Sequence, residues 1–150
     1  MDLPWLSAHL VCHHEAMVAL LPIKISLRVD NPNRFNISSI MNWIPLTAEA
    51  QLSEISTRSK EKPQVIFKHS TRCSISSMAL SRLDRSEGSD AVDFYFLDLI
   101  KYRPISAQIA EQFHVEHESP QVILIKNGVC TYDESHMGIS MDEILEQSSK

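Results

Sequence analysis

QVIFKHSTRCSISSMALSRL, residues 64–83, is the stretch that decides the fold of this 150-residue chain. Gln64–Phe67 is a short apolar run of the kind that a buried strand shows. The polar residues Lys68–Arg72 are predicted to form a loop. From Cys73 to Leu83 the apolar residues recur at helical spacing, which predicts a helix that begins at the cysteine.

Strand-like and helix-like segments alternate on both sides of this stretch. Upstream, Asn42–Leu46 is predicted to be extended, and Thr47 is a favourable N-cap for a helix that runs through Leu52 and Ile55. Downstream, Val92–Leu97 is rich in aromatic and β-branched residues and is predicted to be a strand. Buried strands therefore alternate with amphipathic helices along this part of the chain.

The C-terminal third combines a helix with a hairpin. Pro104 suits the first turn of a helix that is predicted to end near His114. Two strand-like runs, Val122–Ile125 and Val129–Tyr132, lie on either side of Asn127-Gly128. Asn-Gly between two such runs is the strongest short hairpin signal, so these strands are predicted to pair directly.

The last helix is predicted to open with a capping box, in which Ser140 is followed three residues later by Glu143. The complete order is β-α-β-α-β-α-β-β-α, which predicts an α/β fold with a central mixed sheet flanked by helices. All of these elements lie within residues 41–150, which we interpret as one domain. Residues 1–40 are interpreted as an N-terminal extension that is poorly ordered or follows a mis-assigned start; a docking helix over His9–Leu21 stays open as an alternative.

Composition limits the class of function and the compartment. A net charge of -5 and a pI near 5.8 argue against a nucleic-acid binder that relies on general basicity. Three cysteines, an odd number, favour a reducing compartment, so a cytoplasmic protein is expected. The apolar run Ala16–Ile23 is far shorter than the ~20 residues of a membrane span and lacks the basic start of a secretory signal. The histidines and Cys12 within residues 9–15 match no standard zinc spacing, so no metal site is predicted.

Two groups of residues resemble known families. The segment IAEQFHVEHESPQVILIKNG, residues 109–128, resembles thioredoxins in its helix end, in the proline before an apolar strand and in the closing Lys-Asn-Gly. HSTRCSIS at 69–76, with MNWIPL at 41–46 and YRPIS at 102–106, resembles the monothiol bacilliredoxins, also called YtxJ-like bacillithiol system proteins. The resemblance covers residues 41–150 and implies a thioredoxin-like fold. The chain departs from ordinary thioredoxins at Ser76, which replaces the second cysteine of C-x-x-C.

The resemblance to bacilliredoxins implies a thiol-disulfide oxidoreductase in which Cys73 removes bacillithiol from protein mixed disulfides. Bacillithiol is then the co-substrate, bacillithiolated proteins are the partners, no cofactor is bound, and a monomer is expected. Because the malate of bacillithiol carries negative charge, Lys68, Arg72 and Arg103 are candidate counter-charges, although Arg103 is equally well explained as a solvated surface cation. The Ser119–Pro120 bond is expected to be cis and to lie against the cysteine, which leaves the Ser119 backbone free to pair with an extended substrate; an ordinary trans proline stays open.

The chemistry requires a thiolate, so a working cysteine near neutral pH needs a pKa below the free value of ~8.5. The first amides of the predicted helix and the positive end of its dipole favour negative charge on Cys73. Lys68 and Arg72 add positive charge nearby. His69 is either a further contributor or a solvated loop histidine that is mostly neutral at pH 7.

Two other functions stay open: a redox-inert thioredoxin-fold binding module, and an iron-sulfur carrier. The carrier is less favoured because cluster-carrying monothiol glutaredoxins have a Gly-Phe pair where this chain has Ser74-Ile75. Ile75 and Met78 are expected to pack against the core, and Glu116–Glu118 is expected to be a polar connector. Cys130 is not expected to resolve a Cys73 adduct, because a two-residue hairpin loop places it opposite Ile125, far from Pro120.

Overall fold

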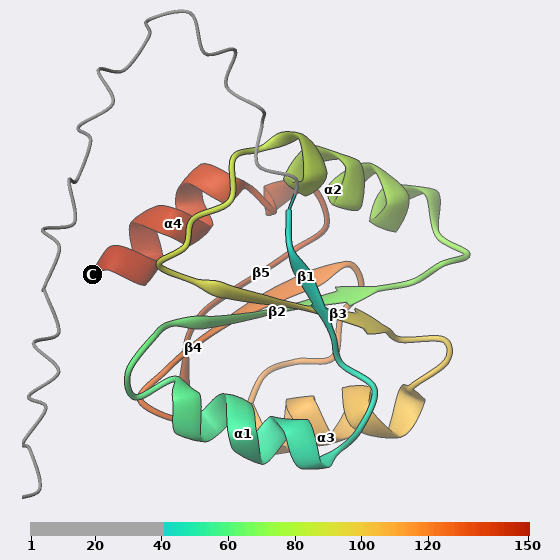
Figure 1. Ribbon diagram of the computed structural model, residues 1–150. Helices are drawn as coiled ribbons and strands as arrows, with labels where there is room; N and C mark the ends of the chain where they lie inside the picture. The colour runs from blue at the N-terminus through green and yellow to red at the C-terminus, as the bar shows by residue number, and fades with distance from the viewer. Residues whose placement is uncertain (1–40) are drawn as a thin grey trace, which may run out of the picture. The chain divides into compact units, whose positions relative to one another are not determined.

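A computed structural model describes residues 41–150 (Figure 1). The strands are β1 Trp43–Pro45, β2 Gln64–His69, β3 Asp93–Asp98, β4 Gln121–Lys126 and β5 Val129–Ser135. The helices are α1 Ala50–Arg58, α2 Ser74–Arg85, α3 Arg103–Phe113 and α4 Met141–Ser149, with a short 3-10 helix η1 at His136–Gly138. The predicted order of strands and helices is therefore confirmed, with η1 as an addition. The expectations for residues 1–40, including the docking helix and the metal-ligand types, lie outside the described residues.

The five strands form one mixed sheet in the order β1-β3-β2-β4-β5. β1 and β2 each pair with β3 in parallel, β4 is antiparallel to β2, and β5 is antiparallel to β4. The helices α1 and α3 cover one face of the sheet, and α2 and α4 cover the other (Figure 1). The predicted α/β fold with a mixed sheet between helices is thus confirmed.

β2 lies in the middle of the sheet and contributes to the core on both faces. Val65 and Phe67 belong to the cluster under α2 and α4, whereas Ile66 belongs to the cluster under α1 and α3. All three are fully buried. A strand that is buried on both faces is apolar without alternation, which explains why residues 65–67 form a continuous apolar run.

The hairpin between β4 and β5 has the predicted register. Lys126 pairs with Val129 and Ile125 with Cys130, and a bulge follows because Leu124 pairs with Tyr132. Asn127 and Gly128 both have positive φ, 54° and 82°, as a two-residue type I′ turn requires. The turn is also anchored to the end of α1, since the amides of Asn127 and Gly128 donate to Ser59 O and Oγ, each at 2.8 Å.

The predicted start of α1 is wrong. Thr47 is not the N-cap; the helix begins at Ala50, with Glu49 in the capping position and no side-chain cap. The Gln51 side chain accounts for the difference, because its Oε1 accepts the amides of Thr47 and Ala48 at 2.8 and 3.0 Å. Those amides need no capping hydroxyl, so the chain turns once more before the helix begins.

The final helix begins at the predicted residue without the predicted capping box. Ser140 is the N-cap of α4, but its side chain makes no capping hydrogen bond. Glu143 instead accepts a hydrogen bond from Gln147 Nε2 at 2.7 Å, one turn further along the helix. The carboxylate is therefore turned away from the N-cap amide that a capping box would bind.

The expected packing of Ile75 and Met78 is also wrong. These side chains are 41% and 51% exposed. The buried residues of α2 are Ser76, Ala79 and Leu83, which share one helical face at i, i+3 and i+7. The face of α2 on the sheet is therefore rotated by one residue from the stripe expected from the sequence.

None of the helices within residues 41–150 has the length and apolar character needed to cross a bilayer.

Residues 41–150 by themselves form a five-stranded sheet with a hydrophobic core on each face, so we expect a chain that starts at Met41 to keep the fold and the activity. The thermal midpoints of the full-length and shortened proteins should agree. A fall of more than ~4 °C, about what 1 kcal/mol costs a domain of this size, would show that residues 1–40 stabilise the core.

Candidate functional site

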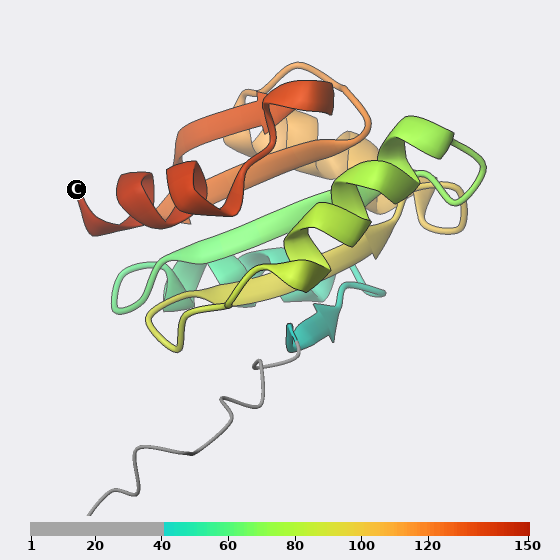
Figure 2. The same ribbon diagram turned by 90° about the horizontal axis from the view of Figure 1, so that it is seen from above.

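Three connections lie at the same end of the sheet, where the parallel strands β2 and β3 finish. The last paired residues of the parallel strands β2 and β3 are His69 and Asp98, and Lys68 of β2 pairs with Gln121, the first residue of β4. The loop before α2, the connection from β3 to α3 and the loop before β4 therefore lie at the same end of the sheet (Figure 2). Ligand sites of open α/β sheets lie at this end, beyond the carboxyl ends of the parallel strands.

Cys73 is the N-cap of α2, as predicted. Its backbone is extended, its thiol is free and half-buried, and its amide donates to Ser70 O at 3.1 Å. The Cys73 carbonyl accepts the Ser77 amide at 3.0 Å, which is the first hydrogen bond of the helix. The sulfur is thus at the helix end where unpaired amides and the dipole stabilise negative charge.

His69 is not a loop residue. The strand β2 continues through Lys68 and His69, so the predicted loop of Lys68–Arg72 begins two residues too early. The His69 side chain is 5% exposed and lies against the rings of Phe67 and Phe96, with centroids 5.9 and 5.3 Å away. Burial lowers the pKa of His69 despite the opposing charge of Asp98, so the buried imidazole is neutral at pH 7. The expectation of a solvated histidine is therefore wrong.

Ser76 occupies the position of the second cysteine of C-x-x-C and is fully buried. Its Oγ lies 2.8 Å from His69 Nδ1 and accepts the Ser70 amide at 2.9 Å. These two hydrogen bonds join the end of β2 to the first turn of α2, with Cys73 in the loop between them. Ser76 therefore holds the cysteine loop closed without supplying a second thiol.

Lys68 is fully buried in β2. Its Nζ donates to Gln121 Oε1 at 2.8 Å and lies 3.3 Å from His117 Nδ1. Burial lowers the pKa of Lys68 to about 8, although the charges of Glu118 and Asp133 oppose this shift. Side chains alternate between the two faces along β2, so Lys68 lies on the same face as Ile66, the face covered by α1 and α3. The Lys68 ammonium lies there beside residues of the segment that precedes β4. The helix α2, which begins after Cys73, covers the other face.

The two candidate arginines are both exposed. Arg72 directly precedes Cys73, and Arg103 is the first residue of α3. Neither forms an ion pair with any residue of the described range 41–150. Both guanidinium groups are therefore available to an anionic ligand. Arg72 lies on the cysteine loop, and Arg103 lies at the start of α3, at the same end of the sheet.

The Ser119–Pro120 peptide bond is cis, as the resemblance implied. Pro120 is buried, and its carbonyl accepts the His136 amide at 3.0 Å, which joins the loop before β4 to η1. Ser119 Oγ is buried with no hydrogen-bond partner among the described residues. The Ser119 backbone likewise has no backbone partner within residues 41–150, so an incoming extended chain could pair with it.

Cys130 lies on β5 opposite Ile125. Burial raises the pKa of its thiol, the charge of Asp133 adds to the shift, and the sulfur donates to Tyr132 O at 3.5 Å. A half-buried neutral thiol with an internal partner is a poor nucleophile.

We expect Cys130→Ser to reduce a mixed disulfide at the wild-type rate. Pro120 is expected to lie beside Cys73, and Ile125, the strand partner of Cys130, is five residues further along the chain. At ~3.4 Å per residue this places Cys130 roughly 17 Å from Pro120. A disulfide needs Cα atoms within about 7 Å. Mass spectrometry of the oxidised protein should therefore find no Cys73–Cys130 bridge; such a bridge in folded monomer would contradict the single-cysteine mechanism.

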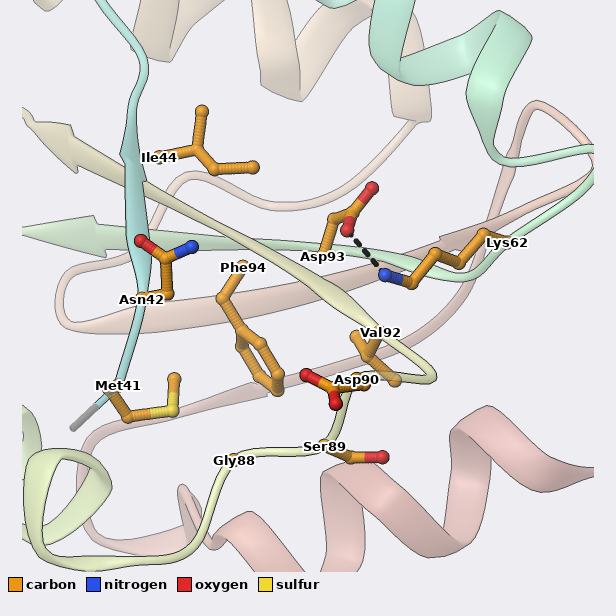
Figure 3. Close-up of a pocket in the computed structure, with 10 residues that line it drawn as sticks. All are labelled: Met41, Asn42, Ile44, Lys62, Gly88, Ser89, Asp90, Val92, Asp93 and Phe94. Atoms are coloured by element: carbon orange, nitrogen blue, oxygen red, sulfur yellow. Dashed lines mark hydrogen bonds and ion pairs between the residues drawn. The ribbon is translucent and has the colours of Figure 1, made fainter. Parts of the chain in front are cut away.

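A separate pocket lies at the opposite edge of the sheet (Figure 3). It has a volume of about 180 Å³, and its walls include Met41, the loop Gly88–Asp90 and the first residue of β3, Asp93. Lys62 reaches Asp93 with Nζ and Oδ1 2.6 Å apart, so the cation and the carboxylate satisfy each other. Within residues 41–150 no group of three or more His, Cys, Asp or Glu side chains could hold a metal ion.

The polar group around buried Lys68 was missed by sequence reasoning. His117 was interpreted as part of a polar connector, yet its Nδ1 contacts Lys68 Nζ and lies 3.4 Å from Ser106 Oγ. Gln121 completes the group and donates to Glu116 O at 3.0 Å. A signal was present, because Lys68 directly follows the apolar run Val65–Phe67 and Gln121 directly precedes the apolar run Val122–Ile125.

Comparisons with known proteins agree with this geometry. The sequence model described as monothiol bacilliredoxin BrxC matches residues 44–144. A solved structure described as a candidate oxidoreductase with a thioredoxin fold is 28% identical, with a TM-score of 0.61, and the match covers 71% of this chain and 93% of that one. The thioredoxin of Malassezia sympodialis is 20% identical, with a TM-score of 0.59 and coverages of 73% and 92%. Fasciola hepatica thioredoxin is 16% identical, with a TM-score of 0.56 and coverages of 70% and 95%.

Proposed function

The chain belongs to the monothiol bacilliredoxin family and is a redox protein with a thioredoxin-like fold, and from this premise we propose that it removes bacillithiol from protein mixed disulfides through Cys73. The observation that carries the proposal is the combination of a thiol at Cys73 with a hydroxyl at Ser76. A free thiol occupies the N-cap of α2, and the position three residues later holds a buried hydroxyl instead of a thiol. This arrangement supports nucleophilic attack by one cysteine and leaves resolution to a second small thiol.

The proposed reaction has two exchanges. The Cys73 thiolate attacks the bacillithiol sulfur of the mixed disulfide, so a Cys73–bacillithiol disulfide forms and the substrate protein leaves as a thiolate that takes up a proton. A second bacillithiol thiolate then attacks the adduct, releases Cys73 as a thiolate and leaves as oxidised bacillithiol disulfide. The positive end of α2 stabilises the sulfur charge at the start and the end of the cycle.

Substrate contacts follow from the loops around the cysteine. The unpaired Ser119 backbone beside cis Pro120 would bind an extended segment of the bacillithiolated protein. Arg72 and Arg103 would attract the carboxylates of bacillithiol directly, and buried Lys68 would act through the field of its charge. We propose a cytoplasmic protein that works as a monomer with bacillithiol as co-substrate and without a bound cofactor.

The proposal is tested with a bacillithiolated carrier protein. The purified chain, supplied with excess bacillithiol, should release the carrier thiol many times per molecule of enzyme. A matched reaction with bacillithiol alone measures the uncatalysed exchange. A rate equal to that background would favour the redox-inert binding module instead.

A further inference from the structure

A largely apolar hollow lies beside the first two turns of α3. It has a volume of about 570 Å³ and is lined by Leu99, Ile100, Arg103, Ala107, Ala110 and His117. We call it the α3 hollow. Four of the six lining residues are aliphatic, and the two polar ones, Arg103 and His117, are exposed. A hollow of this size and character suits a small organic molecule with one charged end.

The wall of the α3 hollow adjoins the end of the sheet that carries the cysteine loop. The amide of its wall residue Leu99 donates to His69 O at 2.9 Å, and His69 is the last residue of β2 before that loop. The Cys73 amide donates to Ser70 O, and the ends of such a turn lie within about 7 Å of each other. Two neighbouring backbone hydrogen bonds thus link the Leu99 wall of the hollow to the loop that carries Cys73.

The polar groups of the α3 hollow are hydrogen-bond donors. An ammonium can only donate, so the contact between Lys68 Nζ and His117 Nδ1 at 3.3 Å makes Nδ1 the acceptor. The proton of the neutral ring is therefore on Nε2, which has no partner within residues 41–150. Arg103 also has no hydrogen bond or ion pair in that range. The hollow thus presents one imidazole N–H and one guanidinium, and both favour an anion.

The surrounding charges leave this preference in place. Lys68 adds a buried positive charge directly behind His117, and Glu118 and Asp133 partly offset it. Asp98, near the start of α3, has an oxygen that already accepts the amides of Ile100 and Lys101 at 3.0 and 3.2 Å. No acidic side chain lines the hollow itself.

We propose that the α3 hollow holds the malate end of bacillithiol while its sulfur is bonded to Cys73. In this arrangement Arg103 binds a malate carboxylate, His117 Nε2–H donates to the same end of the ligand, and Ala107 and Ala110 contact its carbon skeleton. The inference rests on the proposed function and adds to it the place and the residues that select bacillithiol over other small thiols.

The test compares two mixed disulfides of one carrier protein, one with bacillithiol and one with uncharged 2-mercaptoethanol. The second-order rate of transfer to Cys73 is measured for the wild type, Arg103→Gln, Ala107→Phe and the control Lys101→Gln. Ala107→Phe fills the hollow, and Lys101 is an exposed cation that does not line it. We expect the ratio of the bacillithiol rate to the 2-mercaptoethanol rate to fall about tenfold in Arg103→Gln and in Ala107→Phe. The first variant loses a charge-assisted contact, and the second loses the space that the ligand occupies. The ratio for Lys101→Gln should stay within about twofold of wild type.

The outcomes separate this inference from the proposed function. A wild type that transfers bacillithiol, together with unchanged ratios in Arg103→Gln and Ala107→Phe, would overturn the α3 hollow and leave the function standing. Equal slowing of both substrates would also overturn it, because the variants would then affect the cysteine loop in general. A wild type that transfers no bacillithiol would refute the proposed function and this inference together. Thermal midpoints of the variants show that each one folds.

Discussion

Cys73→Ser is expected to reduce transfer of bacillithiol from a carrier protein to the uncatalysed background. A serine hydroxyl at the N-cap of α2 stays protonated at neutral pH, whereas exchange with a disulfide needs a thiolate. The fold should be unaffected, because the Cys73 backbone makes the loop hydrogen bonds and serine is a favourable N-cap. The rate of carrier thiol release measures the effect.

Ser76→Ala is the matched variant for this prediction. Ser76 is buried and bonds both His69 and the Ser70 amide, so its loss should lower the free energy of unfolding by roughly 1–3 kcal/mol. Most of the activity should nevertheless remain, because no step of the one-cysteine mechanism uses the hydroxyl. Activity as low as in Cys73→Ser, in a variant that is still folded, would make Ser76 a catalytic partner.

The second large effect concerns Lys68 and alkaline pH. The pKa of this buried lysine is about 8 in the folded protein, against an ordinary value of 10.5. Between these two values the unfolded chain holds a proton that the folded chain has lost, so the free energy of unfolding rises with pH. The rise is complete above 10.5 and is lost as the pH falls through about 8. The shift corresponds to roughly 3 kcal/mol.

The measurement is denaturant unfolding of the wild type and Lys68→Met at pH 7.5 and pH 10.5. The stability of the wild type relative to the variant should increase by roughly 3 kcal/mol between the two values. Tyr95 and Tyr132, whose pKa values are raised by burial, act in the opposite direction, but they are present in both proteins and cancel. Lys60→Met controls for the loss of an exposed lysine. The same pH dependence in wild type and Lys68→Met would show that Lys68 does not titrate as a buried cation.

Local signals were sufficient for much of the fold. Asn127-Gly128 fixed the hairpin register because few residues tolerate two consecutive positive φ values. Cys73 was placed at the start of a helix because a buried strand precedes it and helical spacing follows it. These features depend on residues close together in the chain, and for this reason a single sequence shows them.

The errors arose where distant segments decide the environment. His69 and Lys68 were assigned to a loop because they are polar, and their burial depends on Ser76 and Gln121 across the fold. The expectation that Ile75 is buried was wrong because a helical stripe does not by itself show which face of the helix meets the sheet. The partners of His117 lie in β2 and α3, so its place in the α3 hollow also required the three-dimensional structure.

The central claim is that Cys73 itself takes bacillithiol from the substrate protein. Intact-mass spectrometry after one turnover without free bacillithiol tests it most directly. The account predicts that the enzyme gains the mass of one bacillithiol, that fragmentation places it on Cys73, and that the carrier protein is recovered with a free thiol. An unmodified enzyme, or an adduct located on Cys130, would contradict the account.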